Sequence, residues 1–254
     1  MKPFPKIKGM MLFLCGGCVR DHLLHKTPKD RDFVMVYKGT FNLGCTLVEQ
    51  SGGRIFQAKE EFLTIRCRID NEVIDLVRPR TEGEYSDGRR PDNVGKARNL
   101  QEDASRRDFT INSLYQRSNG KIIDFFGGQR DIKKKLIRCV GKPKERFKED
   151  FLRILRCVRF SCQLGFTIDK KTLEAMVEYA PGLAKIVPDR IREELNKSLK
   201  ADARLTCYYL DKLNLFSILK EKGLLFEVTQ IVEEKKKVPT IQFESDMKKA
   251  KKNG

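Results

Sequence analysis

Two aspartates separated by one residue, Asp30 and Asp32, stand at the start of a short apolar stretch, residues 33–36. Alternate residues of a strand point to one face, so a strand here would project both carboxylates together. Like charges that close repel one another, a bound cation relieves the repulsion, and hard oxygen ligands favour Mg²⁺. Taken alone, Asp-Arg-Asp is more typical of a solvated turn, but it occurs here together with the glycine pair described next. We predict a Mg²⁺ site with Asp30 and Asp32 as its ligands.

A glycine pair, Gly16 and Gly17, lies upstream between the apolar run 10–15 and a segment with apolar residues at helical spacing. This pattern predicts a strand, a tight turn and a helix. The first amides of a helix lack internal partners and attract anions such as a triphosphate, and Arg20 could add a charged contact. An anion site beside a carboxylate pair is what metal-dependent nucleotidyl transfer requires: one metal activates the attacking hydroxyl while the other holds the triphosphate.

The composition points to a polyanionic partner. The 254 residues carry a formal net charge of +17, and 40% of them are hydrophobic. Nucleic acid is favoured over a membrane surface because the chain has no basic amphipathic helix with a strong aromatic face. No apolar run reaches the length of about 18 residues that a membrane span needs, and the first ten residues lack a signal-type apolar region. We therefore expect a cytoplasmic or similar aqueous location and no membrane partner, and the oligomeric state stays open.

Eight cysteines are scattered mostly among apolar neighbours, as reduced core thiols are. Cys15 and Cys18 form the one suggestive pair, which could serve a redox reaction or half of a zinc site. A zinc site needs two more ligands, and His22 and His25 would have to come from the same helix. The turn explains the intervening glycines better.

Strand-like runs follow at residues 54–57, 62–69 and 73–77, and Asp70-Asn71 is a good hairpin turn between the last two. Strands joined by hairpins and flanked by helices predict an α+β domain with a small mixed sheet. Asp75 could face the site as an extra carboxylate, but we prefer a structural role. The polar segment 80–99, which contains Arg89 and Arg90, is expected to be a mobile basic loop.

Two further segments carry clustered charges. In QEDASRRDFTINSLY, residues 101–115, Glu102 and Asp103 can start a helix, and Arg106, Arg107 and Asp108 precede its apolar part.

In KEDFLRILRCVRFSCQ, residues 148–163, apolar spacing predicts one helix. Asp150 and Arg153 would lie at i and i+3 on its other side and could present a hydrogen-bonding edge to a base. An ordinary helix salt bridge is the alternative. The chain beyond residue 165 is expected to be helical.

These segments together resemble a known family. GGCVRD with KDRDFVMV, EDASRRDFTIN and EDFLR, in this order, resemble the motifs of the bacterial and eukaryotic class of tRNA nucleotidyltransferases and poly(A) polymerases. The resemblance implies a polymerase-β-like nucleotidyltransferase head with a small mixed sheet, followed by an all-helical neck and body. It also implies catalytic roles for Asp30, Asp32 and Asp108, the last acting with the two metal carboxylates. The implied nucleotide contacts are Gly16, Gly17, Arg20, Arg106, Arg107, Asp150, Arg153 and Arg156.

The resemblance further implies that CMP and AMP are added from CTP and ATP to the 3′ end of a tRNA, with Mg²⁺ as cofactor. We expect a head over residues 1–140, a helical neck and truncated body over 141–232, and a basic, disordered tail over 233–254. A longer body and tail that grip tRNA are usual in the family, which leaves a poly(A) polymerase or A-adding enzyme acting on other RNA ends as the nearest alternative. A noncatalytic RNA-binding protein on the same fold and a thiol-based redox or zinc protein are the other two.

Overall fold

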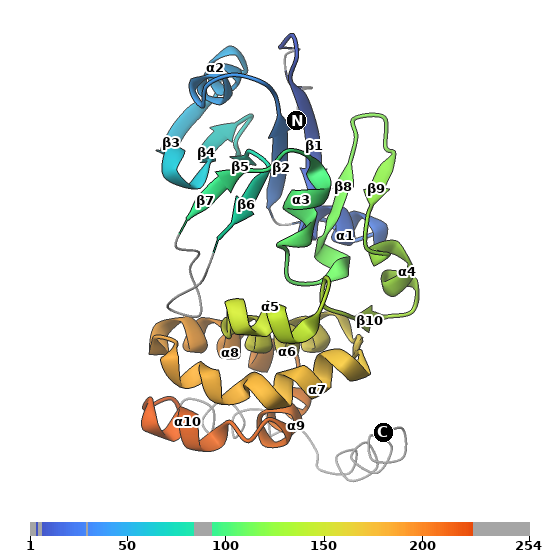
Figure 1. Ribbon diagram of the computed structural model, residues 1–254, viewed down its shortest axis with the longest axis vertical. Coiled ribbons are helices and arrows are strands. Elements are labelled where there is room, and N and C mark those ends of the chain that lie inside the picture. Colours follow the sequence, from blue (N-terminus) through green and yellow to red (C-terminus); the bar gives the residue numbers. More distant parts are fainter. Residues whose placement is uncertain (1–3, 5–6, 29, 84–92, 226–254) are drawn as a thin grey trace.

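The computed structural model describes residues 4, 7–28, 30–83 and 93–225. Its centre is a seven-stranded sheet with the order β3-β4-β5-β2-β1-β8-β9 (Figure 1). The strands in that order are β3 (Arg54–Lys59), β4 (Thr64–Ile69), β5 (Glu72–Val77), β2 (Arg31–Val36), β1 (Met11–Cys15), β8 (Leu114–Gln116) and β9 (Ile122–Asp124). Of these strands only β2 and β5 run parallel, so the sheet is mixed, and the predicted α+β class is confirmed.

The two faces of the sheet differ in what covers them. On one face, Met35, Ile65 and Leu76 pack beneath helix α2 (Asn42–Gln50), and helix α1 (Gly17–Leu23) lies further along the same side. On the other face, Phe13 and Val34 pack against helix α3 (Leu100–Ser105). Because side chains alternate along a strand, Cys15 and Asp32 fall on this second face with Phe13 and Val34. The sheet thus presents its acidic residues on the face away from α2.

Several short elements connect the sheet to the rest of the chain. The strands β6 (Arg80–Glu82) and β7 (Val94–Lys96) pair with each other, and the predicted basic loop with Arg89 and Arg90 lies outside the described residues. After α3 come the 3₁₀ turn η2 (Thr110–Asn112) and, beyond β9, helix α4 (Gly128–Lys133). Strand β10 (Leu136–Ile137) then leads out of the head and pairs with β11 (Thr167–Ile168).

Helices make up the remainder, gathered beneath the sheet in Figure 1. They are α5 (Pro143–Glu149), α6 (Leu152–Leu164), α7 (Lys170–Tyr179), the 3₁₀ segment η3 (Ala180–Lys185), α8 (Pro188–Ala201), α9 (Ala203–Lys212) and α10 (Phe216–Glu221). Helix α6 is central because it packs against α5, α8 and α9. The apolar side chains of Ile191, Leu195 and Leu199 on α8 and of Tyr209 on α9 are buried, whereas Val177 on α7 is exposed. The predicted tail, residues 233–254, lies outside the described residues.

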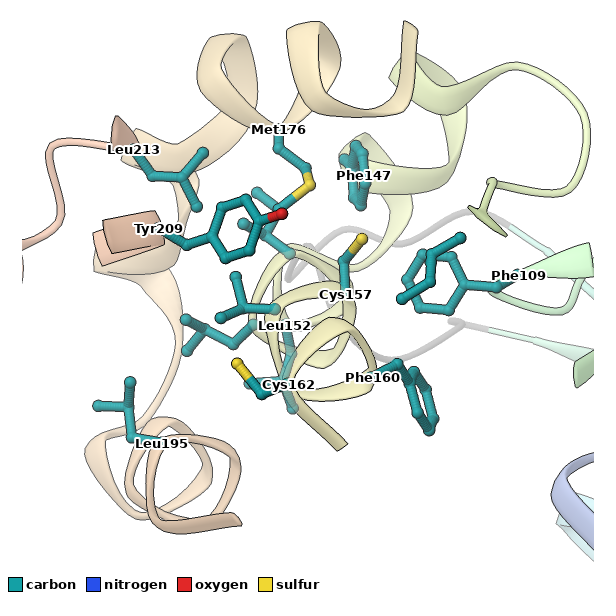
Figure 2. Close-up of a cluster of buried hydrophobic side chains, with 14 of the residues drawn as sticks. Phe109, Phe147, Leu152, Cys157, Phe160, Cys162, Met176, Leu195, Tyr209 and Leu213 are labelled. Carbon is teal, nitrogen blue, oxygen red and sulfur yellow. The ribbon is translucent and has the colours of Figure 1, made fainter. Parts of the chain in front are cut away.

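One apolar core joins the head to the helices. Phe109 from the head packs edge-to-face on Phe160 of α6 with 5.8 Å between ring centroids, and both belong to the cluster that continues through Cys157 to Tyr209 (Figure 2). Val19 of α1 also belongs to this cluster. The head and helix α6 therefore bury apolar side chains in one shared core. The domain boundary near residue 140 stays a prediction.

Three sequence predictions of local structure are wrong. The single helix over residues 148–163 is instead α5 and α6, because Asp150 has an extended backbone (φ −143°, ψ 102°) and its Oδ1 accepts the amide of Leu152 at 2.9 Å. A short aspartate that binds a nearby amide competes with helix continuation. The apolar helix predicted around Phe109 is instead a 3₁₀ turn followed by strand β8, and the side chain that caps α3 is Asn99 rather than Glu102 or Asp103.

Candidate active site

The glycine turn between β1 and α1 is a place of close approach. Gly16 has φ 74°, a conformation that favours glycine, and a Cβ there would lie 3.0 Å from Nη1 of Arg107 and 4.0 Å from Oδ2 of Asp32. Gly17 begins α1, and a Cβ on it would meet the guanidinium of Arg20 at 3.4 Å. The turn therefore brings backbone, two arginines and a carboxylate together within a few ångströms.

The acidic centre contains one more carboxylate than we predicted. Asp32 of β2 pairs in register with Asp75 of β5, so both side chains lie on the same face of the sheet. Burial raises the pKa of Asp32 to about 6, with further increases from Asp75 and Asp30 against an opposing effect of Arg107. Burial also raises the pKa of Asp75, and Asp30 adds to that increase. Burial is the main cause of both shifts, and repulsion from neighbouring carboxylates adds to it. Because Asp75 also shares a face with Asp32, we assign it to the acidic centre rather than to a purely structural role.

The sequence held a signal for Asp75 that our preference for a structural role overrode. Its neighbours Ile74 and Leu76 are both fully buried beneath α2, so strand alternation points Asp75 to the opposite, acidic face.

The donor set suits Mg²⁺. Within the described residues, no group of three His, Cys, Asp or Glu side chains is already close enough to enclose a metal ion. Mg²⁺ is usually held by one or two carboxylates together with substrate phosphates rather than by an all-protein cage. A carboxylate pair with raised pKa beside a glycine turn fits that mode of binding, because a cation would relieve the repulsion between Asp32 and Asp75.

A buried aspartate organises the arginine pair. Asp103 is fully buried and accepts hydrogen bonds from Nη2 of Arg106 at 2.7 Å, from Nη2 of Arg107 at 3.2 Å and from the hydroxyl of Tyr115 at 2.7 Å. Burial alone would raise the pKa of Asp103, but the two arginines and Tyr115 lower it to about 2. The sequence predicts only a helix start for Asp103; its spacing three and four residues before the arginines was the signal for this role.

The arginines held by Asp103 point to different places. Arg107 donates from Nη1 to the carbonyl of Asn112 at 3.3 Å and lies against the glycine turn. Arg106 binds Glu82 of β6 at 2.7 Å as well as Asp103. Arg107 is thus brought to Asp32, while Arg106 links α3 to the β6–β7 hairpin.

Asp108 lies in a second hydrogen-bond network, with Arg156 and Asn112. It accepts hydrogen bonds from Nε of Arg156 at 3.0 Å, from Nδ2 of Asn112 at 3.2 Å and from the amide of Phe109 at 2.7 Å. Burial would raise the pKa of Asp108, but Arg156 and Asn112 lower it to about 2. The groups that act most on Asp32 are Asp75, Arg107, Asp30 and Arg66, without Asp108 among them.

The same network takes up Arg20. Its Nη1 donates to Oδ1 of Asn112 at 2.6 Å, and Nη2 lies 2.7 Å from the carboxylate of Asp21. Arg20, Asn112, Asp108 and Arg156 therefore form a continuous chain of hydrogen bonds from α1 to α6.

Arg153 is buried at the junction of head and helices. Its Nη1 donates to Oε2 of Glu149 at 2.6 Å, and its Nη2 donates to the carbonyl of Arg106 at 3.2 Å. Asp150 lies in the break between α5 and α6, where it binds the amide of Leu152. The spacing i, i+3 on one continuous helix that we predicted for Asp150 and Arg153 does not occur, although the break keeps both residues at the same junction.

The cysteines are free thiols, six of them buried. Cys18 donates to the carbonyl of Cys15 at 2.8 Å, and burial raises the pKa of Cys15 to about 12. A thiol with so high a pKa is a poor nucleophile and a poor metal ligand at neutral pH. No helix in the described part of the chain is long and apolar enough to cross a membrane.

A mixed sheet that carries aspartates beside a glycine turn, joined to a helical region, defines the polymerase-β-like nucleotidyltransferase fold. Residues 12–138 match the family described as "Poly A polymerase head domain", and residues 165–222 match "Probable RNA and SrmB- binding site of polymerase A". The chain belongs to the family of tRNA nucleotidyltransferases and poly(A) polymerases, as the motifs predicted.

Curated relatives of the chain carry the same name, CCA-adding enzyme. The chain is 40% identical over 224 residues to the CCA-adding enzyme of Oceanobacillus iheyensis, covering 82% of this chain and 54% of that enzyme. It is 38% identical over 195 residues to the CCA-adding enzyme of Bacillus subtilis, covering 77% of this chain and 48% of that enzyme. The chain thus spans about half the length of the curated relatives it matches.

Solved structures are similar over the same extent. The Bacillus stearothermophilus CCA-adding enzyme in complex with CTP matches with a TM-score of 0.68 and 31% identity, covering 85% of this chain and 49% of that one. A tRNA nucleotidyltransferase complexed with a primer tRNA and an incoming ATP analog matches with a TM-score of 0.68 and 30% identity, covering 84% and 59%.

Proposed function

We propose that the chain transfers CMP and AMP from CTP and ATP to the 3′-hydroxyl of a tRNA, adding CCA and releasing pyrophosphate. The observation that carries the proposal is the pairing of Asp32 with Asp75 beside the turn at Gly16 and Arg107. Relatives named CCA-adding enzyme, and a related structure that holds CTP, support the choice of substrates. A cytoplasmic location is part of the same proposal.

The acidic residues would hold the metal. Asp30 and Asp32, with Asp75 beside them, are the proposed Mg²⁺ ligands, and bound Mg²⁺ supplies charge stabilisation to the attacking and leaving oxygens of the displacement. Asp32 lies next to Arg107, so the anionic triphosphate would meet a positive group as well as the carboxylates. Asp108, which holds Arg156 and Asn112 in place, is proposed to assist the two metal carboxylates.

The phosphates would lie at the glycine turn. The amides near Gly16 and Gly17 and the guanidinium of Arg107 are the proposed donors, because the missing Cβ atoms let phosphate oxygens approach. Arg20 already donates to Asn112 and Asp21, so its contribution would come through a contact added to those bonds.

The base would be read at the junction of α5 and α6. Asp150 offers carboxylate acceptors and Arg153 a fork of donors, which together can match the edge of a base without a nucleic-acid template. Arg153 is fixed by Glu149 and by the carbonyl of Arg106, so its orientation is set before the nucleotide arrives. Arg106 and Arg156 complete the proposed nucleotide contacts.

The test is incubation of the purified chain with Mg²⁺ and labelled CTP or ATP, separately and together, on tRNA that ends before CCA, after C, and after CC. An unstructured RNA serves as control, and products are resolved to single nucleotides. Addition that stops at CCA on tRNA supports the proposal, whereas a long A ladder on any RNA makes the chain a poly(A) polymerase. Asp32→Ala should abolish incorporation while tRNA binding survives; incorporation by that variant would contradict the assignment.

A further inference from the structure

The acidic face of the sheet continues past Asp75 into an exposed basic and aromatic surface. Arg66 pairs in register with Asp75, and Arg68 pairs with Arg54 of the edge strand β3. A register shift between Ile55 and Gln57 turns Phe56 onto the same face, where the Arg68 guanidinium lies 5.4 Å from its ring centroid. We call Arg54, Phe56, Arg66 and Arg68 the open-face strip.

The strip is exposed although the same strands are buried on their other side. Ile65, Cys67 and Ile69 of β4 are buried on the α2 side of the sheet, whereas the side chain of Arg66 is 54% exposed and Phe56 is 49% exposed. A phenylalanine ring that is half exposed leaves much apolar surface in water, which costs free energy that a bound ligand could recover. Its exposure beside three arginines points to a ligand.

The position of the strip relative to the glycine turn suggests which ligand. In the sheet order, β1 with the glycine turn lies on one side of the β2 carboxylates, and β5, β4 and β3 lie on the other. At a strand spacing of about 4.8 Å, the strip extends from roughly 10 Å to roughly 14 Å from Asp32. Phosphoryl transfer places the attacking and leaving oxygens roughly in line, on opposite sides of the phosphorus. With the pyrophosphate at the glycine turn, the strip beyond the carboxylates lies on the side from which the hydroxyl would approach.

We propose that the open-face strip binds the single-stranded nucleotides immediately upstream of the RNA 3′ end, with a base stacked on Phe56 and phosphates on Arg54 and Arg68. This inference rests on the proposed function, since it uses the same carboxylates and the same RNA end. Aromatic rings flanked by arginines bind single strands without sequence preference, because every base has a face to stack and every linkage has a charge. Arg66 lies 3.6 Å from Asp75, which connects the strip directly to the acidic centre.

The experiment compares two strip variants, Phe56→Ala and Arg54→Glu/Arg68→Glu, with a control at the opposite edge of the same sheet, Lys121→Glu/Phe125→Ala. Lys121 and Phe125 are also exposed and reproduce the kinds of residue changed. Binding of fluorescent tRNA ending after CC is measured by anisotropy without nucleotide or Mg²⁺, over a series of salt concentrations. Thermal melting of each variant confirms that it is folded.

The strip variants should bind tRNA about tenfold more weakly than wild type. The arginine double variant should reduce the slope of log affinity against log salt by about 0.7 for each phosphate that the protein no longer neutralises, and the control should match wild type. In steady-state assays the KM for tRNA should rise while the KM for CTP is unchanged. Arg54→Lys/Arg68→Lys should retain most of the binding that Arg54→Glu/Arg68→Glu loses, because it keeps both positive charges.

Equal tRNA affinity and an equal salt slope in folded strip variants and wild type would overturn the inference, even if wild type adds CCA. Conversely, weaker binding confined to the strip variants would support RNA binding by the open-face strip even if wild type incorporates no nucleotide. The missing incorporation would then count against the proposed function and not against this inference.

Discussion

Asp32 is a proposed Mg²⁺ ligand, and the protonation of its carboxylate links the acidic site to the stability of the fold. Burial and Asp75 raise its pKa to about 6, above the ordinary aspartate value near 4. Between these values the folded chain holds a proton that the unfolded chain has released, so stability falls as the pH rises through this window. The ionised carboxylates therefore destabilise the fold at neutral pH, and a bound cation would relieve their repulsion.

Asp32→Asn should remove that strain. Without Mg²⁺ we expect the variant to be more stable than wild type by about 1–3 kcal/mol at pH 7, and the difference to vanish near pH 4, where Asp32 is protonated in the folded state and half-protonated in the unfolded one. Urea denaturation at both pH values measures this. Mg²⁺ should stabilise wild type at pH 7 more than the variant; a gap of the same size at pH 4 and pH 7 would contradict the argument.

Neutralising Asp103 should destabilise the fold, because its charge is buried and paired. Asp103→Asn leaves Arg106 and Arg107 without their shared carboxylate, and breaking a buried pair typically costs about 3–5 kcal/mol. The control is Glu145→Gln, which breaks an exposed pair with Lys142 (2.9 Å) and should cost less than about 1 kcal/mol. Denaturation at pH 7 compares the two. Similar small costs would show that Asp103 does not hold the arginines.

The break between α5 and α6 serves two purposes that mutation can separate. The carboxylate of Asp150, one residue before the N-cap Phe151, caps the first turn of α6 by accepting the Leu152 amide. The extended backbone at Asp150 lets α5 and α6 pack as separate elements of the helical core.

Asp150→Ala should lose both the cap, worth about 1 kcal/mol, and the acceptors proposed to read the base. Asp150→Asn keeps an oxygen for the cap, so its stability should stay near wild type while its discrimination between CTP or ATP and GTP or UTP falls. Thermal melting and single-nucleotide incorporation with each of the four nucleotides measure the two effects. Unchanged discrimination in Asp150→Asn would remove the residue from base selection.

Across the whole molecule, one hydrogen-bonded chain and one apolar cluster tie the head to the helices. Arg156 of α6 reaches Asp108 of the head, and Phe109 beside it packs on Phe160. A movement of α6 would therefore displace Asn112 and Arg20 through these hydrogen bonds, and both residues lie next to the glycine turn.

A double-mutant cycle of Asp108→Asn and Arg156→Met measures that connection. Because Asp108 is buried, we expect a coupling energy of about 1–3 kcal/mol from urea denaturation. The exposed pair Arg190 and Glu193 (3.1 Å) provides the control cycle, for which we expect less than about 0.5 kcal/mol. Equal coupling in the two cycles would mean that the link between Asp108 and Arg156 contributes no more than a surface ion pair.

The sequence by itself determined the features that depend on neighbours along the chain. The glycine turn, the strand that carries Asp32 and the alternating burial of β4 follow from local periodicity and backbone preference, and the order of the motifs predicted the family. Tertiary structure decided the rest. The strand register places Asp75 beside Asp32, and the buried Asp103 binds two arginines. The packing of α6 on the head brings Arg156 into contact with Asp108. Each of these depends on free energies between distant segments, or on burial that local spacing does not encode, and so each needed the folded chain to be seen.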